Sequence, residues 1–399
     1  MGERRSHRSR RLVLLVTVLI AAVGLGACTS GGETAGNPFG TNDKPSGQGA
    51  PKRPAKVAFE PGDGATDVNP AVPVKVNVTD GSIESLTLTN PAGKQVVGQL
   101  SPDNTSWTVG EHLGYDKTYT WAGTAVGADG KRVRINGSFT TVNPGHLLDA
   151  SINTGDGKTY GIAMPIKITF DAAVTDKAAA QNALSVQTSQ PVDGAWAWLS
   201  DREVHWRPQA YWPANTQVTV TASLYGVNYG DGTYGADDIT STFAIGRNQV
   251  VKADTQTHRM QIFQDGVLAA DFPASMGLDS DPGRVTHSGT HVVMSKHDTY
   301  SMCNKKYDYC DVVVPWAVRI SNNGEFIHGY TGSIPDQGKR NVSHGCVNLS
   351  PNDAKVYFDT ALTGDPVEIT GSSQALAAND GDYYDWTLTW DQWLAKSAV

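Results

Sequence analysis

The sequence predicts a mainly β protein: two β-sandwiches in series, then a mostly β domain with one helix behind a candidate cysteine nucleophile. Three observations predict this fold class. Short runs of alternating apolar and polar residues, separated by Gly, Pro, Asn and Asp turns, begin near Ala55. A Pro-Val-Lys strand starting at Pro73 recurs 92 residues later as Pro-Ile-Lys, starting at Pro165. Just after Cys346, residues 354–362 have the pattern of a helix.

The segment 1–27 has the features of an export signal. Five arginines precede an uncharged run over residues 12–26, which is too short for a spanning helix and fits a signal peptide. The run ends in Leu-Gly-Ala-Cys at residues 25–28, which has the form of a bacterial lipobox. We therefore expect lipidation of Cys28 and an extracytoplasmic protein that is lipid-anchored to the cell membrane. An ordinary signal peptide with a chance cysteine is the alternative, and the export route, Sec or twin-arginine, stays open.

Residues 28–54 are mostly Gly, Ser, Pro, Asn and Thr. Such a segment cannot bury enough apolar surface to offset its ordering entropy, so we expect a flexible tether. The formal net charge of the chain is −8, and no Lys/Arg cluster follows the leader. This charge distribution argues against nucleic-acid binding.

Residues 55–143 and 144–246 are predicted to form two immunoglobulin-like sandwiches, A and B. Each unit opens with a Gly-Asp-Gly turn followed by the Pro-x-Lys strand, and the closing strands also match. Repeated short strands in a unit of this length are typical of an immunoglobulin-like sandwich, although neither unit has the Cys…Trp…Cys framework. In sandwich A, the expected strands are residues 72–78, 85–89, 94–100, 119–126 and 133–141.

Residues 247–371 are predicted to form the third unit. Residues 259–263 and 267–273 read as a hairpin around a Gln-Asp-Gly turn. Ser350-Pro351 supplies an N-cap and a proline at the first helical position, which predicts the helix over residues 354–362. Further strands are expected at residues 291–295, 311–320, 325–328 and 366–370.

Residues 372–399 form a tryptophan-rich tail. Trp386, Trp390 and Trp393 recur at helical spacing, which is typical of an apolar stripe that docks on the body of a protein. We expect this docking near the junction with sandwich B, and no ligand role for the tryptophans.

The strongest chemical signal lies at residues 343–348, which read Ser-His-Gly-Cys-Val-Asn, with His328 lying 18 residues before the cysteine. A thiolate attacks carbonyls, and a nearby imidazole can lower the thiol pKa far enough to populate it. We therefore expect Cys346 to be a nucleophile and His328 its base; a buried inert thiol is the alternative. Cysteine counting agrees, because Cys303 and Cys310 could pair in an oxidising compartment and leave Cys346 as the free thiol.

The motif resembles the Ser-His-Gly-Cys-x-Asn signature of the L,D-transpeptidases, the cysteine enzymes that cross-link bacterial peptidoglycan. The tail and the two β units resemble the actinobacterial members of this family that carry two sandwiches, so the resemblance covers nearly the whole mature chain. It implies a Cys346 thioester, formed on a tetrapeptide stem and resolved by a second stem to give a 3→3 cross-link. It also implies that no cofactor is required for catalysis, that stem peptides are the partners, and that carbapenems are inhibitors.

The resemblance implies roles for residues around the pair. His344 would position the nucleophile, and Asn348 would bind substrate. In similar family members a serine directly follows the histidine that acts as the base. In this chain the residue after His328 is Gly329, whose backbone carbonyl would orient the imidazole. We therefore expect Gly329→Ser to be tolerated. Residues 300–315 would form a flap over the cleft. Further residues implied to contact substrate are Asn323, Gly324, Tyr309, Ser343 and Gly345.

An oxygen-rich turn in sandwich B, with Asn228, Asp231 and Gly232, resembles a loop that could hold a structural Ca²⁺. A plain turn is the alternative. A zinc site built from His328, His344 and Cys346 is disfavoured, because their spacing does not match known zinc sites.

Two other functions remain open from the sequence. The same site with water as acceptor would make an L,D-carboxypeptidase acting on tetrapeptide stems. A catalytically inactive wall-binding module is the second alternative, and Gly329 is the only feature that favours it.

Overall fold

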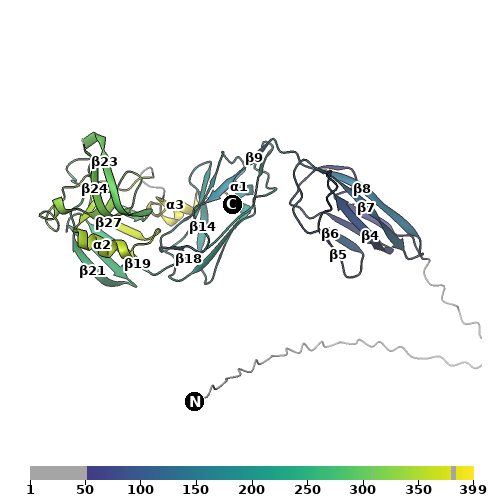
Figure 1. Cartoon of the computed structure of the whole chain (residues 1–399), viewed down its shortest axis with the longest axis horizontal. Coiled ribbons are helices and arrows are strands. Elements are labelled where there is room, and N and C mark those ends of the chain that lie inside the picture. The colour runs from purple at the N-terminus through teal and green to yellow at the C-terminus, as the bar shows by residue number, and fades with distance from the viewer. Residues whose placement is uncertain (1–51, 308, 379–382) are drawn as a thin grey trace, which may run out of the picture. The chain divides into compact units, whose positions relative to one another are not determined.

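The computed structural model describes residues 52–399 except Asp308 and residues 379–382, and it leaves the side chain of Tyr309 undescribed (Figure 1). The expected signal peptide, Cys28 and nearly all of the expected tether lie outside these residues. Within the described part, no helix has both the length and the apolar character needed to cross a membrane. The described elements are mainly strands, which confirms the predicted fold class.

The first sandwich consists of two four-stranded sheets that enclose one apolar core. Most predicted strands are present. The strand expected at residues 94–100 is shorter, because Asn90 accepts hydrogen bonds from the backbone N–H groups of Ala92 and Lys94 and extends the turn. One sheet has the order β1 (Lys56–Glu60), β3 (Lys75–Thr79), β6 (Ser106–Val109), β5 (Gly98–Leu100). The other sheet has the order β2 (Ala65–Val68), β8 (Arg132–Thr141), β7 (Thr118–Gly127), β4 (Gly81–Thr89).

The second sandwich repeats this plan around its own core. Its first sheet has the order β10 (Ala150–Ile152), β12 (Ile166–Phe170), β15 (Glu203–Pro208), β14 (Gly194–Trp198). Its second sheet has the order β11 (Thr159–Tyr160), β18 (Ile239–Ile245), β16 (Gln217–Ala222), β13 (Leu184–Thr188). A short helix α1 (Lys177–Asn182) and a parallel pair, β9 (His146–Leu148) with β17 (Thr233–Gly235), complete it.

A tryptophan lying against a glycine recurs in both sandwiches. A Cβ built on Gly98 would lie 1.8 Å from the ring of Trp107, and a Cβ on Gly194 would lie 2.1 Å from the ring of Trp206. Only glycine leaves room for the indole ring at these positions. The two units therefore share a packing detail as well as a strand pattern.

The third unit has a five-stranded and a four-stranded sheet. Helix α2 (Pro351–Thr360) starts at the predicted cap, since the Ser350 hydroxyl accepts from the Asp353 N–H at 3.1 Å, and it buries Ala354 and Tyr357. The five-stranded sheet has the order β21 (Val267–Pro273), β20 (Arg259–Gln264), β19 (Gln249–Asp254), β27 (Pro366–Thr370), β22 (Gly289–Val292). The four-stranded sheet has the order β23 (Ser295–Asn304), β24 (Tyr309–Arg319), β25 (Phe326–Gly329), β26 (Val347–Leu349).

The tail contacts the second sandwich through its tryptophans. The indole N–H of Trp386 donates to the Ala163 carbonyl at 2.8 Å, and that of Trp393 donates to the Ala195 carbonyl at 2.9 Å. The guanidinium of buried Arg207 lies within 4.6 to 5.3 Å of the Trp386, Trp390 and Trp393 rings, a cation–π arrangement. The expected single helical stripe is in fact split between η3 (Asp385–Thr387) and α3 (Trp390–Leu394).

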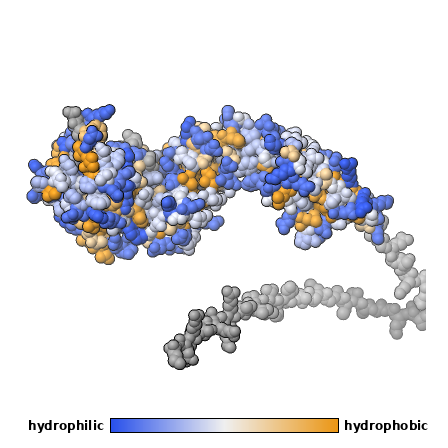
Figure 2. Space-filling model, viewed as in Figure 1, coloured by the Kyte–Doolittle hydropathy of each residue, from blue (hydrophilic) through white to orange (hydrophobic). Residues whose placement is uncertain are grey.

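Exposed apolar side chains are dispersed over the described surface. The most exposed are Val97 in the first sandwich, Val267 and Val313 in the third unit, and Val399 in the tail. On the face drawn in Figure 2, the apolar areas are small and interrupted by polar residues. Scattered apolar residues of this kind are normal on the surface of a folded domain.

Candidate active site

Two adjacent strands bring His328 and Cys346 to one cavity. Strand β25 pairs in parallel with β26, which places His328 opposite Asn348, and Cys346 immediately precedes β26. The cavity has a volume of about 360 Å³. Its lining includes His328, Cys346, His344, Ser343 and Asn348, with an apolar wall made by Met302, Val312, Val314, Val342, Tyr307 and Tyr330.

His328 is oriented by the next residue. Its Nδ1 lies 3.1 Å from the Gly329 carbonyl, which can only accept, so Nδ1 carries the proton and Nε2 is free to act as a base. Burial lowers the pKa of His328 to about 4, and the hydrogen bond to Gly329 opposes this shift. The imidazole is therefore neutral near pH 7.

The thiol of Cys346 donates to the Gly324 carbonyl, with 3.7 Å between sulfur and oxygen. Burial raises the pKa of Cys346 to about 12; the backbone N–H of Phe326 opposes the shift, and the charge of Glu325 adds to it. The expectation that the imidazole lowers the thiol pKa far enough to populate a thiolate is therefore wrong for the resting site. Because His328 is buried and Cys346 is partly buried, the neutral pair is favoured, and His328 must remove the proton during attack.

A neutral pair has a distinct pH dependence. Acylation should be independent of pH between about 5 and 8 and should fall below a pH of about 4, where His328 becomes protonated. Alkylation of Cys346 by iodoacetamide should rise about tenfold per pH unit through the same range, because only the thiolate reacts. Stopped-flow acylation and site-resolved mass spectrometry measure the two profiles. An alkylation rate that is constant between about pH 5 and 8 would indicate a preformed ion pair instead.

Gly329 has no space for a side chain. A Cβ at this position would lie 2.9 Å from the Cα of Pro351 and 3.1 Å from the Cγ of Pro315. The expectation that Gly329→Ser is tolerated is therefore wrong, because the added atom meets the backbone at the start of helix α2.

Gly329→Ala is expected to destabilise the protein by about 1 to 3 kcal/mol through overpacking. Acylation should slow by about tenfold or more, since the displaced carbonyl no longer fixes the His328 ring. Thermal unfolding and acylation rates measure these effects. Gly62→Ala is the matched control, because no atom lies within 4 Å of that added Cβ. Equal behaviour of the two variants would contradict this account of Gly329.

Asn348 combines burial with an unsatisfied acceptor. It is 5% exposed and lines the cavity, and its Oδ1 has no hydrogen-bond partner among the described residues. A buried acceptor without a donor is costly. The structure places Asn348 at the cavity, and its role in substrate binding stays a prediction.

Other predicted site residues divide into two groups. Ser343 lines the cavity, but its hydroxyl is used within the loop: it donates to the Cys346 carbonyl at 2.6 Å and accepts from the Gly345 N–H at 3.2 Å. His344 also lines the cavity, and burial lowers its pKa. Gly345, Asn323 and Gly324 lie beside the cavity and do not line it.

The flap brings Tyr307 to the cavity. Its ring lies 4.9 Å from that of His344, and its hydroxyl lies 3.1 Å from a carboxylate oxygen of Asp281. The side chain of Tyr309 lies outside the described part, so its contact with substrate stays a prediction. The structure pairs Cys303 with Cys310 in a disulfide across the flap.

The turn predicted to bind calcium is held together by a hydrogen bond within the turn. The Asn228 side-chain oxygen accepts from the Gly230 N–H at 2.9 Å, and Asp231 and Gly232 both have positive φ. Such a geometry is typical of a tight turn. Among the described residues, no group of three or more His, Cys, Asp or Glu side chains is arranged to hold a metal ion. Calcium binding at this turn stays a prediction.

The fold and the cavity together define a cysteine-dependent acyl-transfer enzyme. The family model of the L,D-transpeptidase catalytic domain matches residues 248–369, and that of a bacterial Ig domain matches residues 65–228. The second match runs through both sandwiches.

Known proteins agree with this class. L,D-transpeptidase 5 of Mycobacterium tuberculosis is 49% identical over 88% of this chain and 79% of its own length. L,D-transpeptidase 2 of the same species is 35% identical over 100% of this chain and 97% of its own. The solved structure of LdtMt1 in complex with imipenem is 31% identical, with a TM-score of 0.47, over 55% of this chain and 97% of that one. The chain belongs to the L,D-transpeptidase family, as the Ser-His-Gly-Cys motif predicts.

Proposed function

We propose that the protein forms 3→3 cross-links between peptidoglycan stems. The observation that carries the proposal is the shared cavity of the Cys346 thiol and a neutral, oriented His328. The substrate and the linkage come from family membership, because the cavity alone supports only acyl transfer by a thiol.

In the first half-reaction, His328 Nε2 removes the thiol proton as sulfur attacks the carbonyl of the third residue of a tetrapeptide stem. The oxyanion of the tetrahedral intermediate needs a preorganised donor. The Gly345 N–H already donates to Ser343, and we assign this role to the Cys346 N–H. His328 then delivers the proton to the departing amine, and terminal D-alanine leaves.

In the second half-reaction, the side-chain amine of the diamino acid of another stem attacks the thioester. His328 accepts the proton of that amine, and the Cys346 thiol is regenerated as the new amide forms. No step needs a cofactor.

The proposal includes the location of the enzyme. The lipobox-like segment at residues 25–28 supports an anchor at Cys28, and the composition of residues 28–54 supports a flexible tether. The protein would then face the cell wall, with the two sandwiches serving as a spacer. Carbapenems are proposed as inhibitors that acylate Cys346.

Incubation with a purified tetrapeptide stem, with and without an acceptor stem, tests the reaction. The proposal predicts D-alanine release and a 3→3 dimer when the acceptor is present. Tripeptide alone, even with acceptor in excess, would identify an L,D-carboxypeptidase. No D-alanine release from folded protein would favour the inactive wall-binding module.

A further inference from the structure

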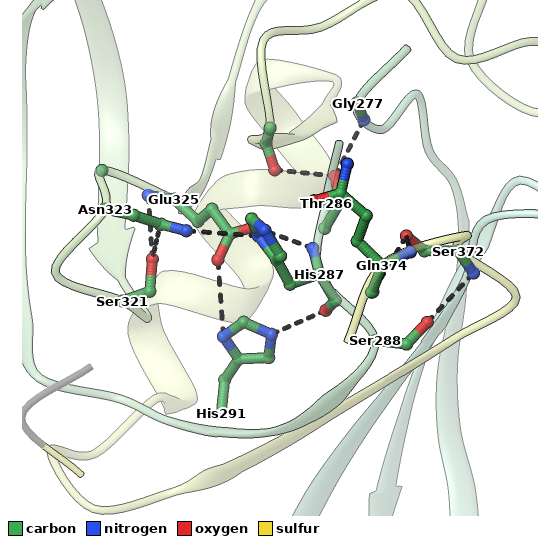
Figure 3. A network of polar contacts seen from close by, with 12 residues as sticks. Gly277, Thr286, His287, Ser288, His291, Ser321, Asn323, Glu325, Ser372 and Gln374 are labelled. Carbon is green, nitrogen blue, oxygen red and sulfur yellow. Dashed lines mark hydrogen bonds and ion pairs between the residues drawn. The ribbon is translucent and has the colours of Figure 1, made fainter. Parts of the chain in front are cut away.

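A buried carboxylate lies behind the nucleophile, and the mechanism above does not use it. Glu325 is 3% exposed and immediately precedes β25, the strand that carries His328. Figure 3 shows it at the centre of a polar network with His287, His291 and Asn323. An ionised carboxylate is expensive to bury unless it is paired, so its position calls for a reason.

Two histidines hold the Glu325 carboxylate. Its Oε1 lies 2.9 Å from both the backbone nitrogen and the Nδ1 of His287 (Figure 3). Its Oε2 lies 3.6 Å from the Nδ1 of His291. Burial raises the pKa of Glu325, but hydrogen bonds from His287 and the positive charge of His291 outweigh it, and the pKa is lowered overall. The carboxylate is therefore ionised.

His291 faces an acceptor with each ring nitrogen. Its Nε2 lies 2.8 Å from the His287 carbonyl, and its Nδ1 lies 3.3 Å from the Ile320 carbonyl, on the side that faces Glu325. Carbonyl and carboxylate oxygens only accept hydrogen bonds. Glu325 and His291 thus form a buried pair.

This pair is connected to the nucleophile by two routes. The peptide groups on either side of Glu325 flank the Cys346 sulfur: the Gly324 carbonyl accepts from the thiol, and the Phe326 N–H also bonds to it. The second route runs through Thr286, next to His287. Its hydroxyl donates to the Gly345 carbonyl at 2.7 Å and accepts from the Gly277 N–H at 2.8 Å.

We propose that Glu325 is a positioning residue for acyl transfer, which fixes the peptide groups around the Cys346 sulfur through its buried pairing with His287 and His291. Its side chain anchors residues 324–326. It also anchors the segment of Thr286 and His287, which supports the loop of Gly345 and Cys346. The charge of Glu325 also disfavours a thiolate close by. The thiol therefore stays protonated until His328 takes the proton with substrate in place.

The inference rests on the proposed acyl transfer. Two substitutions separate the effect of the Glu325 charge from the effect of its side-chain length. Glu325→Gln keeps the size of the side chain but removes the charge. Glu325→Asp keeps the charge but shortens the side chain, so the peptide groups around the sulfur lose their anchor. Glu368→Gln is the control, because it removes a partly exposed carboxylate from β27 in the same domain, outside the cavity.

Two measurements on the full chain test the inference. The first is the pH profile of Cys346 alkylation by iodoacetamide, followed by peptide mass spectrometry, which needs no transpeptidase activity. Glu325→Gln should accelerate alkylation at pH 8 by about threefold or more, which corresponds to a fall of about half a pKa unit. Glu325→Asp and Glu368→Gln should keep the wild-type profile.

The second measurement is steady-state D-alanine release from the tetrapeptide. Glu325→Asp should lower kcat about tenfold or more with little change in KM, because misplaced groups act on the transition state. A wild-type kcat in Glu325→Asp would overturn the inference, and this arm decides even if Glu325→Gln does not fold. An unshifted alkylation profile in folded Glu325→Gln would overturn the charge effect. A wild-type enzyme that releases no D-alanine would instead overturn the proposed function, whatever the alkylation profile shows.

Discussion

Replacement of His328 by alanine is expected to reduce acylation of Cys346 by about a thousandfold or more. The thiol has a pKa of about 12, so almost no thiolate exists near neutral pH without a base. The same imidazole also delivers the proton to the leaving amine, so the variant loses both functions. Pre-steady-state measurement of acyl-enzyme formation, by mass spectrometry on quenched samples, gives the rate directly.

His344→Ala is the matched control for this experiment. His344 lines the same cavity and contacts Tyr307, but it lies on the loop two residues from the nucleophile. We expect a loss of no more than about tenfold, from weaker positioning of the loop. If His328→Ala retained near-normal acylation while His344→Ala did not, the roles of the two histidines would have to be exchanged.

Trp393→Ala is expected to cause the largest loss of stability, about 3 to 5 kcal/mol. Trp393 is fully buried, its indole donates to the Ala195 carbonyl, and its ring covers the Arg207 guanidinium. Removal leaves a cavity and exposes a buried cation to an unfilled space. Denaturant unfolding, followed by tryptophan fluorescence and by circular dichroism, measures the change.

Leu394→Ala is the control for the tail, because the neighbouring leucine is 44% exposed. Its effect should stay within about 0.5 kcal/mol. A similar small effect for Trp393→Ala would show that the tail does not depend on Trp393 to dock on the second sandwich. Detachment of the tail from the second sandwich should also break the contact between His205 and Asp385, which measures 2.8 Å and is fully buried.

Much of the fold could be predicted because local signals agreed with the tertiary structure. The hairpin and the cap at Ser350 depend on nearby residues alone, and strand β21 has the predicted bounds of residues 267–273. The repeated Pro-x-Lys strand also identified a second sandwich. These features need only turn chemistry, alternation and capping, which the sequence displays directly.

The site could be predicted only in part. The motif predicts that Cys346 and His328 lie together, and the structure places both at one cavity. Their protonation states depend on burial, which spacing does not reveal. The crowding at Gly329 arises from Pro351 and Pro315, distant in the chain. Glu325 has a local signal in the sequence: it is an acidic residue at the start of an apolar strand, three positions before His328. Its partners His287 and His291 lie far away in sequence and had no motif.

The most direct test of the account is the mass of the acyl-enzyme formed with the tetrapeptide stem. The full-length protein is mixed with donor, quenched in acid and digested, and the peptide that contains Cys346 is weighed. The account predicts an adduct on this peptide equal to the donor without its terminal alanine, and no adduct in Cys346→Ala. An adduct on another residue, or one that persists in Cys346→Ala, would contradict the assignment of Cys346 as the nucleophile.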